Sequence, residues 1–385
     1  MDQEKLARSE KKIRVLIAAP SLDIKGGQSR QAVRLMEGLK TEPSIEVGFL
    51  PHNPRLPGLL RVLQRIKYVR TVVTTLTYWL MLLFRARKYD IIHTFSAAYY
   101  SYLLSAAPAI LIGKLYGKKT ILNYRSGEAE DHLQRWPLTT VPIMRLADEI
   151  VVPSGYLVDV FKRFGLKARP IFNIVELDRF KYRERSKLRP VFLVSRLLEP
   201  LYNVACVLRA FALIQEKYPE AKLTVAADGW LRGELEQLAK DLNLRNTEFI
   251  GFVPFEEMPR MYDSADIYLT ASDIDNMPSS IVECMASGLP VVTTNAGGIP
   301  YIVKDQETCL MIERGDYRAM AECAFRLLED PDLAVRIARR AREECRRYTW
   351  ENVRDEWVKL YKRLASQGEE RGKVRTTVDA VEENS

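Results

Sequence analysis

Short apolar runs flanked by turn residues alternate with amphipathic stretches along the whole chain. In the first half, the runs that predict strands are IRVLIAAPS (13–21), IEVGFL (45–50), YDIIHTFS (89–96), KKTILNY (118–124) and ADEIVVPS (147–154), and SRQAVRLMEGL (29–39) predicts a helix. After a polar stretch the pattern restarts, and the predicted strands are PVFLVSR (190–196), AKLTVAADG (221–229), TEFIGFV (247–253), ADIYLTAS (265–272) and LPVVTTN (289–295). This alternation is typical of parallel β-sheets covered by helices. Two such series predict an α/β fold of two Rossmann-like domains, with the boundary at residues 170–190.

Length and composition agree with this organisation. The chain has 385 residues, and a single hydrophobic core stops growing at about 250–300 residues. Residues 1–12 are charged and lack the apolar core of a signal peptide, and residues 366–385 are polar, so we predict disorder at both ends. The five cysteines all lie in the second half without C-x-x-C spacing, which argues against a disulfide framework or a structural zinc site and favours a reducing cytosol. With three histidines in all, a histidine-rich metal centre is not predicted.

Residues 54–88 form a basic segment that contains no acid. Its uncharged part, residues 71–84, is too short to span a bilayer. One interpretation is an amphipathic basic surface attracted to anionic lipid, which would place the protein in the cytoplasm at the inner face of the membrane. The alternative is one or two helices that pack on a sheet and expose solvated basic faces. Nucleic acid is not a predicted partner, because no nucleic-acid-binding motif accompanies the charge.

Several motifs follow predicted strands. Gly26 and Gly27 follow the first strand, Arg196 ends another, and Asp228 with Gly229 ends a third. Ligands of open α/β sheets bind at the carboxyl ends of the strands, so these motifs are predicted to contribute to a ligand site. A glycine pair just before a helix lets backbone amides approach an anion, although a plain turn into a helix is an equal alternative.

The stretch DIDNMPSSIVECMASGLPVV, residues 273–292, is the most informative. Pro278 cannot extend a preceding helix, and Ser279 or Ser280 can cap a new helix that ends at Gly288. This pattern predicts free backbone amides near Ser280 and Ile281, where a phosphate would bind.

The carboxylates of this stretch have competing interpretations. Glu283 lies one turn into the predicted helix, where it can serve a ligand or close a capping box with Ser280. Asp273 and Asp275 form a D-x-D pair, a pattern that binds metal and nucleotide in some sugar-transferring enzymes. Because the pair follows a strand and leads directly into a capped helix, we prefer an anion site and predict no metal.

The motifs occur in an order that is informative as a whole: the glycine pair at Gly26, VSRLLEP with Arg196, AADGWLRGELEQL, FIGFVPFEEMPRMYDSADIYLTASD and the stretch ending ECMASGLPVVTTNAGG. Together they resemble family 4 glycosyltransferases of the GT-B fold. The resemblance runs from Ile13 to about Leu364 and is densest from Val191 to Gly315. It implies two facing Rossmann-like domains with a cleft between them. Their expected bounds are 13–175 on the acceptor side, 176–345 for the nucleotide sugar, and 346–365 for a last helix that crosses back to the first domain.

The resemblance also implies roles for individual residues. Glu283 matches the family's second acid, which holds the ribose hydroxyls, and Asp275 stands where the first acid, usually Glu, lies near the donor sugar. Arg196 matches the arginine that faces the diphosphate. The implied catalytic residues are Asp275, Glu283 and Arg196. The implied donor-binding residues are Gly26, Gly27, Arg196, Gly229, Ser280, Ile281 and Glu283.

The chain departs from the family pattern at two places. Leu201 stands where the family commonly has a lysine, in an R-x4-K pattern, so one diphosphate cation is missing. Arg125 stands where an acceptor-side histidine is expected, and it would bind charge rather than act as a base. His132 and His93 are the other acceptor-side candidates, although a structural role for His93 is as well supported.

The resemblance predicts a retaining, metal-independent glycosyltransferase without a cofactor. It would move a sugar from a nucleotide-diphosphate sugar to a glycan, lipid-linked or other acceptor. The expected route is front-face attack, in which the leaving diphosphate accepts the proton of the acceptor. Leu201 and Arg125 keep open a catalytically impaired nucleotide-sugar-binding protein, and a sugar-nucleotide epimerase on the same fold is a further alternative.

Overall fold

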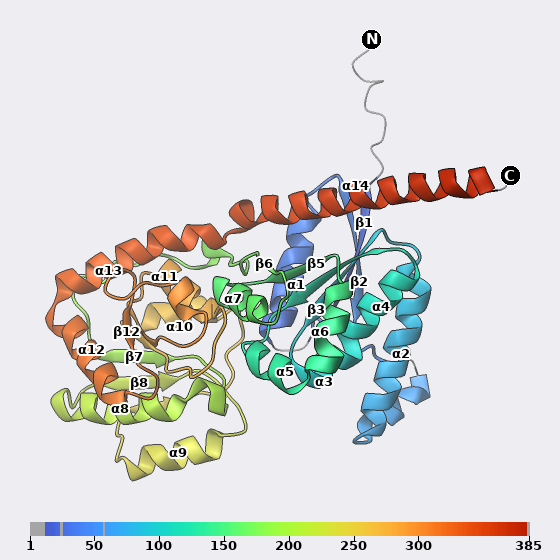
Figure 1. Cartoon of the computed structure of the whole chain (residues 1–385). Coiled ribbons are helices and arrows are strands. Elements are labelled where there is room, and N and C mark those ends of the chain that lie inside the picture. Colours follow the sequence, from blue (N-terminus) through green and yellow to red (C-terminus); the bar gives the residue numbers. More distant parts are fainter. Residues whose placement is uncertain (1–11, 24–25, 57, 383–385) are drawn as a thin grey trace. The chain divides into compact units, whose positions relative to one another are not determined.

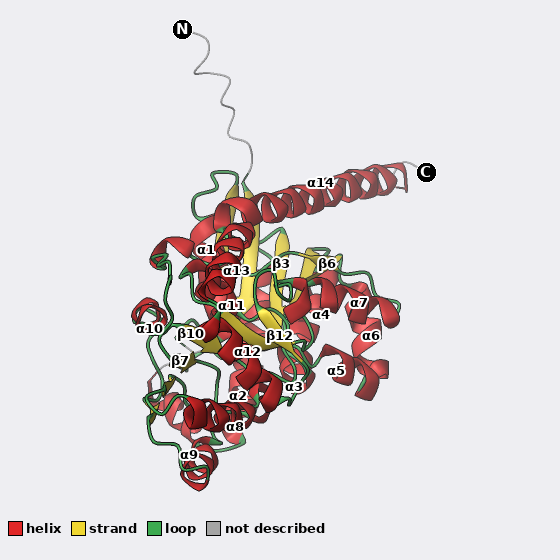
Figure 2. Cartoon of the chain, turned by 90° about the vertical axis from the view of Figure 1, so that its left-hand side faces the viewer, coloured by secondary structure: helices red, strands yellow, loops and turns green. Residues whose placement is uncertain are grey.

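The computed structural model describes residues 12–23, 26–56 and 58–382. The chain divides into two compact units, the first from Met1–Ile174 and Val353–Ser385 and the second from Val175–Asn352. Each unit contains one six-stranded sheet. Figure 1 labels the elements along the chain, and Figure 2 shows strands in yellow with helices in red around them.

The first unit is built on a parallel sheet with the strand order β2-β1-β3-β4-β5-β6. Its strands are β1 (Ile13–Ala19), β2 (Ile45–Pro51), β3 (Ile91–Ser96), β4 (Lys119–Tyr124), β5 (Glu149–Val152) and β6 (Arg169–Pro170). Its helices are α1 (Gly27–Leu39), η1 (Gly58–Arg65), α2 (Val69–Ala86), α3 (Tyr99–Ser101), η2 (Tyr102–Ala106), α4 (Ala107–Leu115), α5 (Ala129–Arg135), α6 (Pro137–Leu146) and α7 (Gly155–Arg163). Strands β3 and β4 are buried along their whole length, as expected for inner strands of a parallel sheet that is covered on both faces.

The second unit is built on a parallel sheet with the strand order β12-β11-β10-β7-β8-β9. Its strands are β7 (Val191–Val194), β8 (Lys222–Val225), β9 (Thr247–Phe249), β10 (Ile267–Leu269), β11 (Val291–Thr294) and β12 (Leu310–Ile312). Its helices are η3 (Leu177–Arg179), η4 (Pro200–Tyr202), α8 (Val204–Lys217), α9 (Arg232–Asp241), α10 (Met258–Ser264), α11 (Ser279–Ala286), η5 (Ile299–Tyr301), α12 (Tyr317–Glu329), α13 (Pro331–Glu344) and η6 (Cys345–Tyr348). The sheet packs against α8 and α12 through a core that includes Phe192, Phe211 and Leu327.

The last helix, α14 (Trp350–Glu382), begins at the end of the second unit and belongs to the first unit from Val353 onward. Trp357, Leu360 and Tyr361 are buried, and Tyr361 Oη forms a hydrogen bond with His93 Nδ1 of β3. The predicted crossing of the last helix back to the first domain is therefore confirmed.

The predicted series of strands is confirmed in both units, with two strands added. One prediction outside the strands, the disorder of the C-terminal residues, needs a correction. Strands β6 and β12 were not predicted, because their runs are very short. The disorder predicted for residues 366–385 is wrong for residues 366–382, which continue α14 as a helix. This stretch contains no proline, and adding residues to a helix that is already nucleated by packed turns costs little. The predictions for residues 1–11 and 383–385 lie outside the described residues.

Candidate functional site

The strand order of the second sheet reverses direction between β7 and β10. From β7 the chain proceeds outward through β8 and β9, and from β10 it proceeds the other way through β11 and β12. In open α/β sheets, ligands bind beyond the carboxyl ends of the strands at such a switch point. The loop after β7 contains Arg196, and the loop after β10 contains Asp275. The topology alone therefore brings these two predicted site residues to the same edge of the sheet.

Arg196 and Asp275 form a largely buried ion pair. The distance from Arg196 Nη2 to Asp275 Oδ2 is 2.5 Å, and the side chains are 14% and 11% exposed. Arg196 Nη1 also donates to Ser280 Oγ at 3.4 Å, and the guanidinium lies 4.2 Å from the ring centroid of Tyr202. Burial alone would lower the pKa of Arg196, but the charge of Asp275 outweighs it and the pKa is raised above its usual value. Arg196 is thus a permanent cation held at the switch point.

The loop that carries Asp275 is held by close backbone packing against a glycine pair. Gly298 N donates to Asp275 O at 2.9 Å. Gly297 has φ +51°, and a Cβ at this position would lie 2.2 Å from the same carbonyl oxygen. A Cβ on Gly298 would lie 1.8 Å from Asn276 O. Only glycine permits this approach, so Gly297 and Gly298 position the carboxylate.

Gly229 plays a similar part on the other side of Arg196. A Cβ at Gly229 would lie 2.5 Å from Leu198 O, and Leu198 N donates to Asp228 O at 3.1 Å. The loop after β8 is therefore packed against the loop after β7. This contact explains why position 229 is glycine, while its predicted part in donor binding stays a prediction.

Helix α11 begins at Ser279 with Pro278 as its N-cap, and no side chain caps it. Ser280 therefore lies inside the helix, and the capping box with Glu283 does not form. The prediction of a free amide at Ile281 is also wrong, because Ile281 N donates to Pro278 O at 3.2 Å. The predicted stop at Gly288 is confirmed, since this glycine has φ +66° directly after the helix.

Glu283 has a specific partner that the sequence did not reveal. Its Oε2 accepts a hydrogen bond from Tyr262 Oη at 2.9 Å, and both side chains are buried. Burial, and then the charge of Glu283, raise the pKa of the Tyr262 hydroxyl well above its usual value. Tyr262 therefore remains a neutral donor that orients the carboxylate.

The two acids of the D-x-D pair have different partners. Asp273 accepts hydrogen bonds from Asn203 Nδ2 at 3.1 and 3.3 Å, whereas Asp275 is paired with Arg196. Asn203 adopts a left-handed conformation and caps α8. Leu201, which stands in place of the family's lysine, contributes its carbonyl oxygen to Asp273 N at 2.9 Å. The prediction that no metal is needed at this pair stays a prediction.

The acceptor-side candidates lie in the first unit, where the side chains of both histidines are buried. His93 is fully buried. Its Nε2 accepts from Asn123 Nδ2 at 2.9 Å, so Nδ1 carries the proton toward Tyr361 Oη at 2.7 Å. His132 is equally buried and hydrogen bonds to Tyr124 Oη at 3.0 Å. Neither ring presents a nitrogen to solvent, which favours the structural alternative for His93, and the predicted acceptor-side role of His132 stays a prediction.

Arg125 is held among neutral groups. It donates from Nε to Asn123 Oδ1 at 3.1 Å and from Nη1 to Asn173 Oδ1, and its guanidinium lies 5.1 Å from the ring centroid of Phe95. Burial lowers its pKa to about 9, so it stays charged at neutral pH. Among the described residues no carboxylate forms an ion pair with it. Its predicted role in binding charge stays a prediction.

The burial of His93 predicts a specific pH dependence of stability. Burial, with the charge of Arg125, lowers the pKa of His93 from 6.5 to about 3. The unfolded chain therefore takes up a proton on His93 below pH 6.5 and the folded chain does not. This contribution to stability is complete above pH 6.5 and is lost as the pH falls from 6.5 toward 3. Between pH 6.5 and about 5 we expect a loss of about 2 kcal/mol in the free energy of unfolding from this one group.

Urea unfolding at several pH values checks this expectation against His93→Gln, which cannot titrate. The variant is expected to be less stable at neutral pH but to lose less stability on acidification. His52 and His132 also have lowered pKa values, so the difference between the two proteins isolates His93. Equal pH slopes in the wild type and the variant would contradict the prediction.

Gly26 and Gly27 lie at the start of α1 in the first unit. Gly26 has an extended backbone with φ −173°, and a Cβ on either glycine would meet no atom within 4 Å. Neither the local backbone nor the packing of the described residues requires glycine here. The predicted use of these positions for close approach to a ligand stays a prediction.

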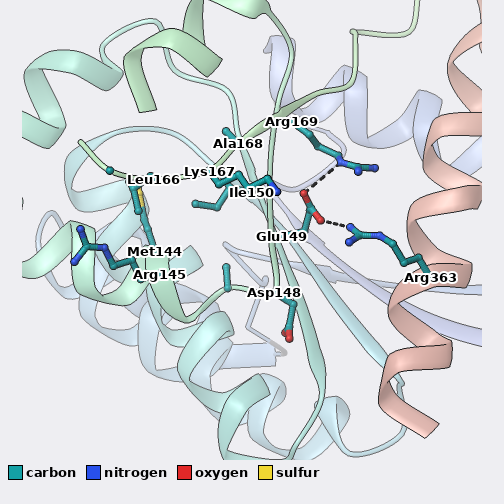
Figure 3. Close-up of a pocket in the computed structure, with 12 residues that line it drawn as sticks. Met144, Arg145, Asp148, Glu149, Ile150, Leu166, Lys167, Ala168, Arg169 and Arg363 are labelled. Carbon is teal, nitrogen blue, oxygen red and sulfur yellow. Dashed lines mark hydrogen bonds and ion pairs between the residues drawn. The ribbon is translucent and has the colours of Figure 1, made fainter. Parts of the chain in front are cut away.

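A hollow of about 350 Å³ lies elsewhere in the first unit. Figure 3 shows Glu149 between Arg169 and Arg363, with an ion pair to each. Glu149 and Arg169 are the first residues of β5 and β6, so the hollow lies at the amino ends of the strands. This is the edge of the sheet opposite to the one where α/β folds bind ligands. We therefore exclude it from the candidate site.

Comparison with known proteins decides the family. Residues 175–344 match the family model "Glycosyl transferases group 1". The second unit is a group 1 glycosyl transferase domain. The matched region contains Arg196, Asp275 and Glu283. The predicted family is thus confirmed at the level of group 1.

Two curated relatives show the extent of the likeness. A D-inositol 3-phosphate glycosyltransferase of Corynebacterium urealyticum is 31% identical over 181 residues, which cover 45% of this chain and 43% of the relative. The sulfoquinovosyl transferase SQD2 of Arabidopsis thaliana is 33% identical over 140 residues, 36% of this chain and 27% of the relative. The chain thus spans less than half the length of these relatives.

Solved structures confirm the fold over almost the whole chain. Anabaena Alr3699/HepE in complex with UDP matches with a TM-score of 0.71 at 16% identity, covering 91% of this chain and 99% of that chain. Sucrose-phosphate synthase from Thermosynechococcus elongatus matches with a TM-score of 0.74 at 19% identity, covering 92% and 100%. The group 1 domain is therefore the second part of a two-domain α/β chain of the GT-B type.

Several residues that shape the site were missed by sequence reasoning. They are Tyr202, Tyr262, Ser272, Gly297 and Gly298. The glycine pair Gly297 and Gly298 carried a usable signal, because it comes one residue after the predicted strand LPVVTTN, much as Gly26 and Gly27 follow the first strand. The aromatic and hydroxyl partners carried none, since their roles depend on which loops the sheet brings together.

Proposed function

We propose that the protein is a retaining glycosyltransferase that uses a nucleotide-diphosphate sugar as donor and a glycan or lipid-linked molecule as acceptor. The observation that supports this best is the buried cation Arg196 at the switch point of the group 1 domain, next to the first turn of α11. A diphosphate leaving group carries developing negative charge, and a preorganised cation there lowers the barrier to its departure.

The ion pair supports a role for Arg196 in binding the diphosphate and argues against Asp275 as a nucleophile. Asp275 Oδ2 accepts from Arg196 and from Ser272 Oγ, at 3.3 Å for the latter. A carboxylate held this way is poorly placed to attack a sugar. Arg196 Nε is buried and has no hydrogen-bond acceptor among the described residues. An anionic oxygen could satisfy this donor, because a charged N–H group favours a charged acceptor.

The proposed mechanism assigns positioning and charge stabilisation to the protein. Arg196 would stabilise the departing diphosphate, Glu283 would hold the ribose hydroxyls in register, and the acceptor's proton would pass to the leaving phosphate oxygen. The proposal requires no metal ion, since Arg196 supplies positive charge. The alternative of a protein that binds the donor without turnover is favoured by one observation: Asp275 already neutralises Arg196 in this structure.

The first test is thermal stabilisation by a panel of nucleoside diphosphates and nucleotide sugars. One nucleotide sugar is expected to raise the melting temperature of the wild type in a concentration-dependent manner, because a ligand that binds only the folded chain adds about 2.7 kcal/mol at 100 times its Kd. Glu283→Gln is expected to lose this response. Tyr262→Phe is the matched control, since it removes the hydrogen bond to Glu283 but leaves the carboxylate.

The two variants distinguish a ligand-binding role from a structural one. If Glu283 contacts the donor, Tyr262→Phe retains most of the response that Glu283→Gln loses. If Glu283 serves only to bond Tyr262, both variants lose stability alike and both still respond to the donor. A transferase is then distinguished from a binding protein by the release of nucleoside diphosphate, which a transferase shows only when an acceptor is present. An epimerase would instead convert the nucleotide sugar without an acceptor.

A further inference from the structure

Helix α2 is apolar on two opposite sides. Tyr78, Leu82 and Ala86 are fully buried against the first sheet. On the other side, apolar residues spaced by three or four positions are exposed: Val69, Val72, Leu76, Leu80 and Phe84. This spacing places them in one stripe along the helix. Leu80 and Phe84 are 55% and 71% exposed. A helix that is apolar all round is normally buried, so this stripe requires a partner.

Figure 1 shows α2 at the outer edge of the first unit, beside α4. Its apolar stripe is extended by neighbouring elements. Before α2, the exposed apolar side chains include Val62, Ile66 and Tyr68, and α4, which contacts α2, exposes Leu111 and Leu115.

Cations border this apolar surface. Arg61, Arg65, Lys67 and Arg70 are all exposed just before and at the start of α2, and Arg87 and Lys88 follow its end. Residues 54–88 contain no acid. Among the described residues, none of Arg61, Arg65, Lys67 and Arg70 forms an ion pair. Their charge is therefore available to an external anion.

We propose that the docking face, formed by Val62, Ile66, Val69, Val72, Leu76, Leu80 and Phe84 with the cations Arg61, Arg65, Lys67 and Arg70, binds the surface of an anionic lipid bilayer. The apolar side chains enter the boundary between headgroups and acyl chains, and the cations contact lipid phosphates. None of the described helices has the length and apolar character needed to cross a bilayer. With 18 residues, α2 is about 27 Å long and lies along the surface.

The charge pattern favours a bilayer over a protein partner. An apolar interface between proteins is depleted of charge at its core and needs acids on the partner to match each cation. A bilayer that contains anionic lipid matches any arrangement of cations, because its charges move laterally. The face combines several unpaired cations with aliphatic and aromatic side chains, the composition typical of interfacial helices.

The inference is tested by flotation of the full chain with vesicles of pure phosphatidylcholine and of phosphatidylcholine mixed with phosphatidylglycerol, without donor or acceptor. The wild type is expected to float with the mixed vesicles and to bind the neutral ones more weakly. Arg61→Glu/Arg65→Glu/Arg70→Glu is expected to weaken binding to the mixed vesicles by at least about 100-fold, since each basic residue contributes about fivefold. Leu76→Ser/Leu80→Ser/Phe84→Ser is expected to abolish flotation with both vesicles.

A control variant removes the same charge elsewhere. Arg336→Glu/Arg340→Glu/Arg346→Glu changes the net charge equally, at exposed positions of the second unit, and is expected to bind as the wild type does. Equal losses in both charge variants would overturn the proposal, because the effect would then come from net charge. Absence of wild-type binding to the mixed vesicles would also overturn it.

A second copy of the chain is the competing occupant of the face. If the wild type is a dimer in solution, the serine variant is a monomer and neither binds vesicles, the face is a protein interface and the lipid proposal is wrong. The inference does not depend on the proposed transfer reaction. All docking-face variants are expected to retain transfer to a water-soluble acceptor, so failure of vesicle binding and failure of catalysis are separate results.

Discussion

Replacing Arg185 with methionine is expected to lower the free energy of unfolding of the second unit by about 3–5 kcal/mol, the range for breaking a buried charge network by removing one partner. Arg185 is only 3% exposed. Its guanidinium donates to five carbonyl oxygens at 2.8–3.1 Å, those of Arg183, of Tyr262 and Ala265 at the end of α10, and of Ser287 and Gly288 at the end of α11.

The position of these carbonyls explains the size of the effect. Tyr262 lies in α10, and Ser287 and Gly288 follow the last turn of α11. Unpaired carbonyls at a helix C-terminus require a donor, and a cation there also opposes the helix dipole. Methionine fills the space but donates nothing, so buried acceptors lose their partner at about 1–3 kcal/mol each, less any relaxation. Burial lowers the pKa of Arg185 to about 10, which leaves it charged at neutral pH.

Arg189→Met is the matched control for Arg185→Met. Both arginines lie near Asp266, but the Arg189 side chain is 60% exposed. Its loss is expected to cost about 1 kcal/mol, as for a solvent-screened ion pair. Urea unfolding, together with native-state hydrogen exchange of α10 and α11, measures the loss of stability in both variants. If the two variants lose similar stability, the carbonyl network of Arg185 does not hold the second unit together.

Replacing Arg196 with alanine is expected to lower kcat/KM for sugar transfer by about 10²–10³, the effect of removing one preorganised donor from a site where charge develops. The donor for this assay is the nucleotide sugar that stabilises the wild type. The kcat/KM of Arg196→Lys is expected to lie between those of the wild type and Arg196→Ala, because a lysine restores the charge but not the planar fork that suits phosphate oxygens.

Arg196→Ala also leaves the carboxylate of Asp275 buried without its cation, which destabilises the fold. The double variant Arg196→Ala/Asp275→Asn removes both charges. Stability is expected to return in the double variant while transfer remains low. Recovery of transfer would show that Arg196 acts only to neutralise Asp275, and the proposed role at the diphosphate would be wrong. Thermal melts and release of nucleoside diphosphate measure the two properties separately.

Much of the site could be predicted where local chemistry decides. Gly288 was predicted to end a helix because a left-handed residue there suits glycine, and its φ is +66°. Arg196 was placed at the end of a strand by the apolar run that precedes it. The capping box between Ser280 and Glu283, one of the two interpretations of Glu283, does not form, because the N-cap is Pro278 and not Ser280.

The sequence by itself determined the alternation of strands and helices, the existence of two α/β units and the family of the second. These depend on periodicity and on Gly and Pro punctuation, which act over a few residues. Only the tertiary structure decided the partners across long separations: Arg196 with Asp275, 79 positions apart, and His93 with Tyr361, 268 positions apart. It also decided which side of α2 is covered, because a helix that is apolar all round gives no local indication of the face that packs. Contacts of this kind follow from the order of strands in a sheet and from the packing of elements onto it, and neither is encoded in any short stretch of the chain.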